Sequence, residues 1–361
     1  MKRRIAIAGA GMAGASLAAA LAPHDAVTLL EAEDQPGYHA TGRSAAFWSE
    51  AYGGPGVQPL TSASEAFLAD PLPRFGGTLL HRRGELVIAR DSGAIDRMAA
   101  DFAGTGVTMT RCDPRERVPQ LKAGWSGLWL PSTADIDVAR LHAGYLAQAR
   151  ADGACLRCRA GIARAERRGG VWRIILADGD VLEADVLVNA AGAWGDALAE
   201  IAGAAPIGLG AYRRTVVQLR IDPPVPASLP LVIDAAGDFY FKPEAGGRLW
   251  LSPHDETPQA PGDAAAEELD VALAIHRFEQ ATDWRIAVVE RRWAGLRSFA
   301  PDRLPVYGFD PRVDGLFWCA GQGGFGIQTA PAAARLCAAL LGRGTVPDGV
   351  DAARYEAARF G

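Results

Sequence analysis

The chain has 361 residues, of which 49% are hydrophobic and 22% are charged, and its net charge is −5. This length is enough for two folded domains, and the composition is typical of a globular protein. The acidic balance and the lack of a long basic run argue against nucleic acid as a partner. The five scattered cysteines do not resemble a disulfide framework, which indicates a reducing, cytoplasmic compartment.

The N-terminal segment has two interpretations. Three basic residues, Lys2 to Arg4, precede the apolar run Ile5 to Ala22, and this order resembles a secretory signal peptide. The run is rich in glycine and alanine, however, and a second apolar stretch over residues 26–31 follows it. We therefore expect a strand, a glycine turn, a helix and a second strand. No later run is long and apolar enough to span a bilayer.

Periodicity and turn residues predict the elements of the chain, which begin in strand–helix–strand order and become strand-rich later. In the first part of the chain we expect a strand over 4–8, a helix over 13–22, a strand over 26–31, a loop over 37–58, a helix over 62–70, a strand over 85–89 and helices over 95–104 and 137–153. Strands are then expected over 155–162, 170–176 and 181–188, with a hairpin turn at Asp178-Gly179, and over 214–220, 231–233, 238–242 and 248–252. The last elements expected are a helix over 264–281, a strand over 315–320 and a helix over 329–341. The opening order predicts an α/β fold with a parallel sheet.

The glycine-rich segments lie near the two ends and the middle of the chain, with proline-punctuated strands between them. We predict a Rossmann-like dinucleotide-binding domain built from three separated segments, 1–80, 135–200 and 298–361. An inserted α+β substrate domain, 81–134 and 201–297, would carry a mainly antiparallel sheet.

The first glycine-rich turn, Gly9-Ala-Gly-Met-Ala-Gly14, lies between the first strand and the first helix. Its first glycine permits the tight turn, the second lets the backbone approach a pyrophosphate, and the third lets the helix pack against the strand. The helix N-terminus offers free N–H groups to phosphate. Glu31, at the end of the second strand, can accept hydrogen bonds from ribose hydroxyls. Together these residues predict a dinucleotide, either NAD or FAD.

Two other turns favour FAD over NAD. Val186 to Trp194 is a buried strand that ends in small residues, and Gly321 to Gln328 again joins a strand to a helix. A helix N-terminus at the pyrimidine end of a flavin would stabilise the negative charge of its reduced form. An NAD enzyme has no need of this second helix start. An ordinary glycine-rich loop is the alternative interpretation of the segment.

Five segments, in one order over nearly the whole chain, resemble the D-amino acid oxidase superfamily of FAD-dependent oxidoreductases. They are the turn from Gly9, the loop Ala40-Thr-Gly-Arg-Ser-Ala-Ala46, the turn Asn189-Ala-Ala-Gly-Ala-Trp194, the segment Trp293-Ala-Gly-Leu-Arg-Ser-Phe299 and the turn Gly323-Gly-Phe-Gly-Ile-Gln328. This superfamily includes sarcosine and glycine oxidases and D-amino acid dehydrogenases. Within it, the chain resembles the bacterial D-arginine dehydrogenases.

The resemblance implies one FAD molecule, extended and bound without a covalent link. Relatives that attach their flavin do so through a cysteine shortly after the segment that contains Arg297, where this chain has Ser298-Phe-Ala-Pro301. The residues implied to surround FAD are Gly9, Gly11, Ala13, Gly14, Glu31, Ala32, Thr41, Gly42, Arg43, Ser44, Ala45, Ala46, Ile162, Ala191, Gly192, Gly323, Gly326 and Ile327. No metal site is predicted, because the CxxC pair Cys155 and Cys158 lacks further ligands.

An amino acid substrate carries a carboxylate, which a planar guanidinium grips with two hydrogen bonds. Arg297 is the candidate for this role, and a surface ion pair is its alternative interpretation. The resemblance places Tyr240 and Arg214 near the same carboxylate, although Tyr240 could be a core aromatic and Arg214 a solvated residue. It also implies that Tyr52 lies at the mouth of the site over the flavin.

Substrate specificity has a candidate in Glu85, which matches a glutamate that faces the distal cation of D-arginine in the relatives. An exposed strand-edge glutamate is the alternative interpretation. The resemblance further implies Gly324 and Gln328 beside the flavin. Phe47 departs from the D-arginine enzymes, which have a histidine there, and this puts the preferred substrate in question. The histidines form no metal or catalytic cluster, and His39, beside the flavin loop, is expected to be structural.

The predicted reaction is the FAD-dependent oxidative deamination of a D-amino acid, with a basic, D-arginine-like substrate as one option. A hydride passes from Cα to flavin N5, and the imino acid hydrolyses to a 2-oxo acid and ammonia. The expected partners are a small amino acid and an electron acceptor, which is oxygen, a quinone or an artificial acceptor. The alternatives are oxidation of sarcosine, glycine or a cyclic imino acid, a flavin-binding electron-transfer subunit without its own substrate, and a pyridine-nucleotide dehydrogenase.

Overall fold

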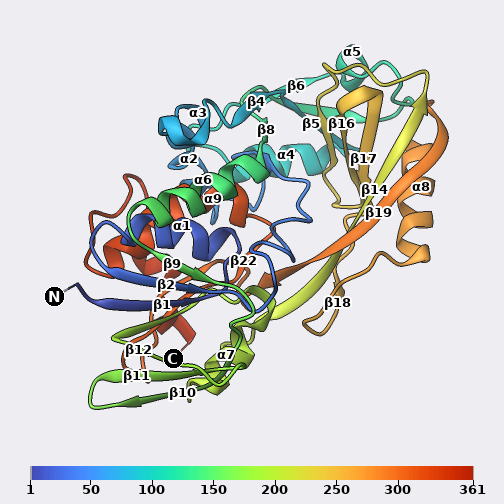
Figure 1. Cartoon of the computed structure of the whole chain (residues 1–361). Coiled ribbons are helices and arrows are strands. Elements are labelled where there is room, and N and C mark those ends of the chain that lie inside the picture. Colours follow the sequence, from blue (N-terminus) through green and yellow to red (C-terminus); the bar gives the residue numbers. More distant parts are fainter. Residues whose placement is uncertain (1, 361) are drawn as a thin grey trace.

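Two large sheets organise the molecule, as the computed structural model of residues 2–360 shows. A six-stranded sheet and its helices form one end, and a ten-stranded sheet forms the other (Figure 1). Smaller sheets and short helices fill the space around them.

The six-stranded sheet has the strand order β20-β21-β13-β1-β2-β9. Its strands are β1 (Arg4–Ala8), β2 (Ala26–Leu30), β9 (Cys155–Arg157), β13 (Val186–Asn189), β20 (Val306–Phe309) and β21 (Leu316–Ala320). All neighbouring pairs are parallel except β20 with β21. Strands from distant parts of the chain thus bring their carboxyl ends to one edge, where open parallel sheets bind ligands.

Helices cover one face of this sheet and a small second sheet covers the other. Ile5 and Ile7 of β1 pack on α1 (Met12–Leu21), α6 (Val138–Ala151) and α9 (Gly326–Leu340). Ala6, between them, points to the opposite face, because side chains alternate along a strand. That face is covered by β10 (Ile162–Arg168), β11 (Val171–Leu176), β12 (Val181–Ala184) and α7 (Gly195–Ile201), as Figure 1 shows.

The ten-stranded sheet is mainly antiparallel, with the order β22-β19-β14-β17-β16-β15-β5-β7-β6 and β18 beside β14. Its strands are β5 (Glu85–Ala89), β6 (Thr110–Cys112), β7 (Ser126–Leu130), β14 (Gly210–Asp222), β15 (Leu231–Asp234), β16 (Tyr240–Glu244), β17 (Arg248–Ser252), β18 (Thr257–Pro258), β19 (Arg285–Phe299) and β22 (Gln322–Gly323). The amphipathic helix α8 (Glu268–Ala281) buries Val271, Ala274 and Phe278 against it. Helix α4 (Ser92–Asp101) packs on the β5–β7 part.

The remaining elements are short. They are β3 (Phe47–Trp48), β4 (Leu80–Arg82), β8 (Ala134–Ile136), α2 (Gln58–Ser62), α3 (Glu65–Ala69), α5 (Pro114–Arg117) and the 3-10 turns η1 (Pro73–Phe75), η2 (Gly192–Trp194), η3 (Ala245–Gly247), η4 (Ala352–Tyr355) and η5 (Ala357–Phe360). Three of them, β3, β8 and β4, form a separate small sheet.

The predicted α/β fold is confirmed, and the differences in detail have physical reasons. The expected strands over 155–162 and 181–188 each divide between two sheets, because a continuous apolar run does not reveal where a strand changes partners. The expected helix over 62–70 is two short helices. The long strand β19 was not expected, because much of it is exposed on both faces and lacks alternation. The boundaries of the two domains stay a prediction.

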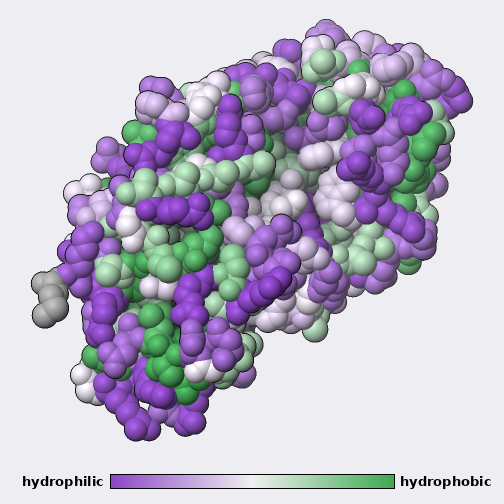
Figure 2. Space-filling view, in the orientation of Figure 1, coloured by the Kyte–Doolittle hydropathy of each residue, from purple (hydrophilic) through white to green (hydrophobic). Residues whose placement is uncertain are grey.

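Figure 2 shows hydrophilic and hydrophobic residues interspersed over one face of the molecule. Within residues 2–360, no helix has the length and apolar character needed to cross a bilayer.

Candidate functional site

A cavity of about 480 Å3 lies where the two sheets meet. Its lining combines the carboxyl ends of β1, β2 and β13 with residues of β14, β16 and β19 and the start of α9. The three glycine-rich turns that the sequence places far apart therefore share one elongated cavity. An extended ligand can contact all three at once.

The β1–α1 turn forms one wall of this cavity. Gly9 has a φ of +101°, and a Cβ atom there would lie 2.3 Å from the carbonyl oxygen of Ala190. Only glycine permits this contact, which joins the turn to the end of β13. Gly11 and Ala13 line the cavity at the N-terminus of α1, where first-turn N–H groups lack intrahelical acceptors. The turn can therefore hold a phosphate group.

Glu31 and Thr41 brace the same turn from neighbouring segments. Oε2 of Glu31 accepts a hydrogen bond from Ala10 N at 2.9 Å, and Oγ1 of Thr41 accepts one from Met12 N at 2.9 Å. Glu31 is 9% exposed and lines the cavity at the end of β2, which is the position that a ribose-binding carboxylate occupies. The donor and acceptor groups present thus fit a dinucleotide.

The start of α9 lines the opposite part of the cavity with Gly323, Gly324, Gly326 and Ile327. A helix N-terminus presents partial positive charge. This is the arrangement that stabilises negative charge on a reduced flavin.

Two arginines line the same end of the cavity. Arg214 on β14 pairs with Gly295 of β19, and Arg297 is two residues further along β19, so both side chains project from one face of the sheet. Tyr240 of β16 lines the cavity beside them and is 2% exposed. The guanidinium carbon of Arg297 lies 5.8 Å from the ring centroid of Tyr52.

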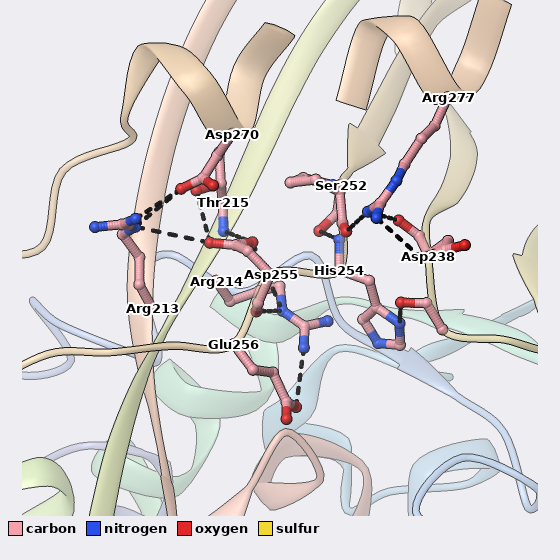
Figure 3. A network of polar contacts seen from close by, with 12 residues as sticks. Arg213, Arg214, Thr215, Asp238, Ser252, His254, Asp255, Glu256, Asp270 and Arg277 are labelled. Carbon is pink, nitrogen blue, oxygen red and sulfur yellow. Dashed lines mark hydrogen bonds and ion pairs between the residues drawn. The ribbon is translucent and has the colours of Figure 1, made fainter. Parts of the chain in front are cut away.

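Arg214 is held from behind by the segment that follows β17. Its Nε donates to Asp255 O at 2.8 Å and its Nη2 to Glu256 at 3.2 Å, as Figure 3 shows. Its Nη1 is buried and has no hydrogen-bond partner among residues 2–360. The neighbouring Arg213 points to the other face and pairs with Asp270 (Figure 3). Arg214 therefore has one donor free for a ligand.

Burial and charge act differently on the two arginines. Burial, together with the charge of Arg297, lowers the pKa of Arg214 to about 10. Burial also disfavours the charged form of Arg297, yet its pKa is raised because the oxygens of Tyr52 and Tyr240 lie near. Burial raises the pKa of Tyr240, and the charges of Arg297 and Arg214 act in the opposite direction. Both arginines remain cationic at neutral pH, so this end of the cavity suits an anion.

Most of the predicted cofactor residues line the cavity. Those that do are Gly9, Gly11, Ala13, Glu31, Ala32, Thr41, Arg43, Ser44, Ala45, Ile162, Ala191, Gly192, Gly323, Gly326 and Ile327. Gly14, Gly42 and Ala46 are outside the lining and support the surrounding backbone. Of the predicted substrate residues, Arg297, Arg214, Tyr240 and Gly324 line it.

Three predicted substrate residues are not part of the lining. Tyr52 packs between Phe47 and Phe325, with ring centroids at 5.0 and 5.3 Å. Gln328 is buried, and its amide bonds Ser49, Tyr52 and Thr61, which holds the loop after β3. Glu85 is 2% exposed and accepts a hydrogen bond from Thr133 Oγ1 at 2.9 Å.

Burial raises the pKa of Glu85, against the hydrogen bonds from Ser49 and Thr133. A neutral carboxyl is therefore the favoured form in this surrounding. Phe47 packs against Tyr52 and Tyr240 at the nearby end of the cavity. Glu85 is thus a buried polar residue outside the cavity lining, and its part in substrate specificity stays a prediction.

Several residues that line the cavity are not among the predicted site residues. These are Tyr38, His39, Trp194, Gly262 and Ala264, with smaller contributions from Met12, Gly161, Leu198 and Val216. Nε2 of His39 lies 2.8 Å from Oε1 of Glu33, and its ring centroid lies 4.7 Å from that of Trp194 in a tilted arrangement. A signal for His39 and Trp194 was available, because both lie beside glycine-rich turns, whereas Gly262 and Ala264 lie in a segment without a motif.

His254 was also missed. Its ring lies 6.4 Å from that of Tyr52 and 5.6 Å from that of Tyr240, and its Nδ1 lies 3.1 Å from Gly237 O (Figure 3). Its φ of +56° is unusual for a residue other than glycine. This strained residue lies in the segment that follows β17, beside Tyr52 and Tyr240.

Within residues 2–360, no cluster of His, Cys, Asp or Glu has the arrangement of a metal site. The family model described as FAD dependent oxidoreductase (DAO) matches residues 4–340. The chain belongs to this family. Its cofactor is FAD, which agrees with the predicted superfamily and with the donor groups that line the cavity.

The curated relatives are distant. The tRNA 5-methylaminomethyl-2-thiouridine biosynthesis bifunctional protein MnmC of Albidiferax ferrireducens is 26% identical, over 99% of this chain and 58% of that protein. The glycine oxidase of Pseudomonas putida is 30% identical, over 49% of this chain and 46% of that enzyme. This chain spans about half the length of the curated relatives that it matches.

Solved structures share the fold over nearly the whole chain. Glycine oxidase from Geobacillus kaustophilus has a TM-score of 0.85 at 24% identity and covers 98% of each chain. L-proline dehydrogenase from P. horikoshii has a TM-score of 0.83 at 20% identity, over 96% of this chain and 95% of that one. At these identities the likeness concerns the fold.

Proposed function

We propose that this protein oxidises the Cα–N bond of a small amino acid, and of a D-amino acid in particular. The pair Arg214 and Arg297 is the observation that supports this most strongly. The buried Arg214 and the half-buried Arg297 lie on adjacent strands at the end of the cavity that the start of α9 also lines. Guanidinium groups bind carboxylates with paired, charge-assisted hydrogen bonds. The preference for the D form comes from the sequence resemblance.

The residues of the chain would orient the substrate and prepare its amine. Arg297 would hold the carboxylate, and the free Nη1 of Arg214 would donate to one of its oxygens. Two nearby cations also favour the uncharged form of the substrate amine, because they disfavour a third positive charge. An uncharged amine has the lone pair that must become the second C–N bond. Holding one end of the substrate in this way reduces the entropy cost of reaction.

FAD supplies a two-electron acceptor for the hydride that leaves Cα with its bonding pair. The amine nitrogen then forms a double bond to Cα, and water hydrolyses the released imino acid to a 2-oxo acid and ammonia.

A basic, D-arginine-like side chain is the less supported form of this proposal. Glu85 would have to be ionised and to face the substrate, but it is buried behind the cavity and its raised pKa favours the neutral acid. A distal cation would also lie near two arginines. We therefore expect a small, uncharged side chain.

A second candidate is oxidation of glycine or of a secondary amine. It is supported by relatives and structural neighbours named glycine oxidase and L-proline dehydrogenase. Glycine and secondary amino acids carry the same carboxylate, which the two arginines would bind in the same way. The substrate panel described next distinguishes the two candidates.

Anaerobic reduction of the bound flavin tests the proposal. We expect loss of its visible absorbance with one or more members of a panel of D-amino acids, glycine, sarcosine and proline, with no other protein added. We expect Arg297→Ala to lower kcat/KM by about 100-fold with FAD still bound, because a charged hydrogen-bonded pair is lost. The exposed Arg291 of the same strand provides the control variant Arg291→Ala.

A flavin that no member of the panel reduces would overturn the proposal and favour an electron-transfer subunit. An Arg297→Ala variant with the activity of the wild type would remove Arg297 from the substrate site. Repeating turnover with oxygen and with an artificial acceptor identifies how the flavin is reoxidised.

A further inference from the structure

We propose that His142 is a positioning residue of the cofactor site. Its side chain holds the Gly9–Gly14 turn in the shape that receives the diphosphate of FAD. This inference rests on FAD as the cofactor and not on the identity of the substrate. His142 lies on α6, far from the glycine-rich turns in sequence, and is 9% exposed.

The first observation is the hydrogen bonding of Ala10, the residue between the first two glycines of the turn. Its N–H donates to Glu31 Oε2 at 2.9 Å, and its carbonyl oxygen lies 2.9 Å from Nε2 of His142. A carbonyl oxygen only accepts, so Nε2 carries the proton. Burial lowers the pKa of His142, against the hydrogen bond to Ala10 and the charge of Glu31, and a neutral ring results. Two side chains therefore hold both polar atoms of Ala10.

The second observation is the contact of the same imidazole with Gly37. Gly37 has a φ of +76°, and a Cβ atom there would lie 2.8 Å from Cε1 of His142. Its carbonyl oxygen accepts a hydrogen bond from Gly42 N at 2.8 Å, at the base of the loop that carries Thr41. The ring thus lies between two cofactor-binding segments and contacts both.

These contacts determine where the phosphate-binding N–H groups point. Gly11 and Ala13 follow Ala10 directly, and both line the cavity. Rotation of the peptide that begins with the Ala10 carbonyl would turn the N–H of Gly11. Without the histidine donor, the Ala10 oxygen loses this hydrogen bond in a buried place, and the preorganised shape of the turn becomes less favourable.

Binding to the flavin-free protein tests the proposal without any activity measurement. The informative pair is His142→Gln, whose amide reaches about as far as Nε2 and can donate, and His142→Asn, which is shorter. The dissociation constant for FAD is measured by quenching of flavin fluorescence, and those for ADP and adenosine by calorimetry. We expect His142→Asn to weaken the binding of FAD and ADP about tenfold, and His142→Gln to keep both affinities within about threefold of the wild type. Adenosine binding should be unchanged in both variants.

The control variant is Tyr145→Phe on the same helix, because the Tyr145 hydroxyl has no hydrogen-bond partner in the described part of the chain. It should bind all three ligands as the wild type does. The proposal is overturned if His142→Asn binds ADP as tightly as the wild type, or if it weakens adenosine as much as ADP.

Discussion

At the scale of single residues, Glu85 is a buried titratable group that does not line the cavity. It is buried, bonded to Thr133, and has no cationic partner within 4.0 Å among residues 2–360. Arg214 is similarly buried and Arg297 is half-buried, and both line the cavity. The direction of a side chain, which the sequence does not specify, separates a carboxyl outside the cavity from the guanidiniums that line it.

The raised pKa of Glu85 predicts a stability effect. Its carboxyl keeps its proton in the folded protein at pH values where the unfolded chain, with a glutamate pKa of about 4.3, has lost it. The free energy of unfolding therefore falls as pH rises from that value toward the higher folded pKa. Glu85→Gln removes this cost and should raise Tm by about 2–4 °C at neutral pH, with little change near about pH 4.

Thermal unfolding of Glu85→Gln against pH checks this expectation, with the exposed Glu200→Gln on α7 as a control for the change in net charge. A variant less stable than the wild type at neutral pH would mean that Glu85 is ionised in the folded protein.

At the scale of elements, the segment between β18 and α8 closes part of the cofactor cavity. Gly262 and Ala264 line the cavity. Arg43, in the loop of residues 40–46 (the cofactor loop), donates to Ala264 O at 2.8 Å and to Ala294 O at 3.2 Å. The same guanidinium pairs with Asp263. One arginine therefore ties the cofactor loop to both β19 and this segment.

The exposed Arg43–Asp263 pair predicts a modest effect on cofactor retention. Asp263→Asn should speed FAD release about 2- to 5-fold, because surface ion pairs contribute little. Arg43→Ala should speed it more, since two carbonyl hydrogen bonds are lost as well. Release is followed by the rise of flavin fluorescence after dilution. High salt should bring the wild type close to Asp263→Asn, and a salt-independent difference would contradict the ionic explanation.

The elements also show what the sequence could and could not predict. The β1–α1–β2 unit was predicted closely, because its glycines, strand and acid are local signals. Arg297 was found through family resemblance, although its strand β19 was not predicted. His142 was missed, because its contact joins residues separated by 132 positions. The lining role of Ala264 was missed for the same reason, since only tertiary packing brings it to the cavity.

At the scale of the whole molecule, the cavity joins two sheets with separate cores. Tryptophans report on both cores, because Trp48 and Trp318 lie around the six-stranded sheet and Trp284 packs on the ten-stranded sheet. A ligand that contacts both sides stabilises the folded protein by mass action, provided that it does not bind the unfolded chain.

FAD should therefore raise Tm in proportion to the logarithm of its concentration. At 100 times its dissociation constant it adds about 2.7 kcal/mol to the free energy of unfolding. Removal of FAD should lower Tm, and tryptophan fluorescence and circular dichroism should follow the same transition in the FAD-bound protein. A transition unmoved by FAD would mean that one core unfolds independently of the cofactor.

The pairing of β14 with β19 has a consequence for how this protein could acquire a new substrate. Since the spacing of Arg214 and Arg297 is set by the hydrogen-bond ladder, a one-residue slip would turn one of them away from the ligand. Mutation therefore cannot change that spacing in small steps. Variation should instead accumulate in the surrounding loops, while the proposed anchor for a substrate carboxylate persists as the rest of the pocket diverges.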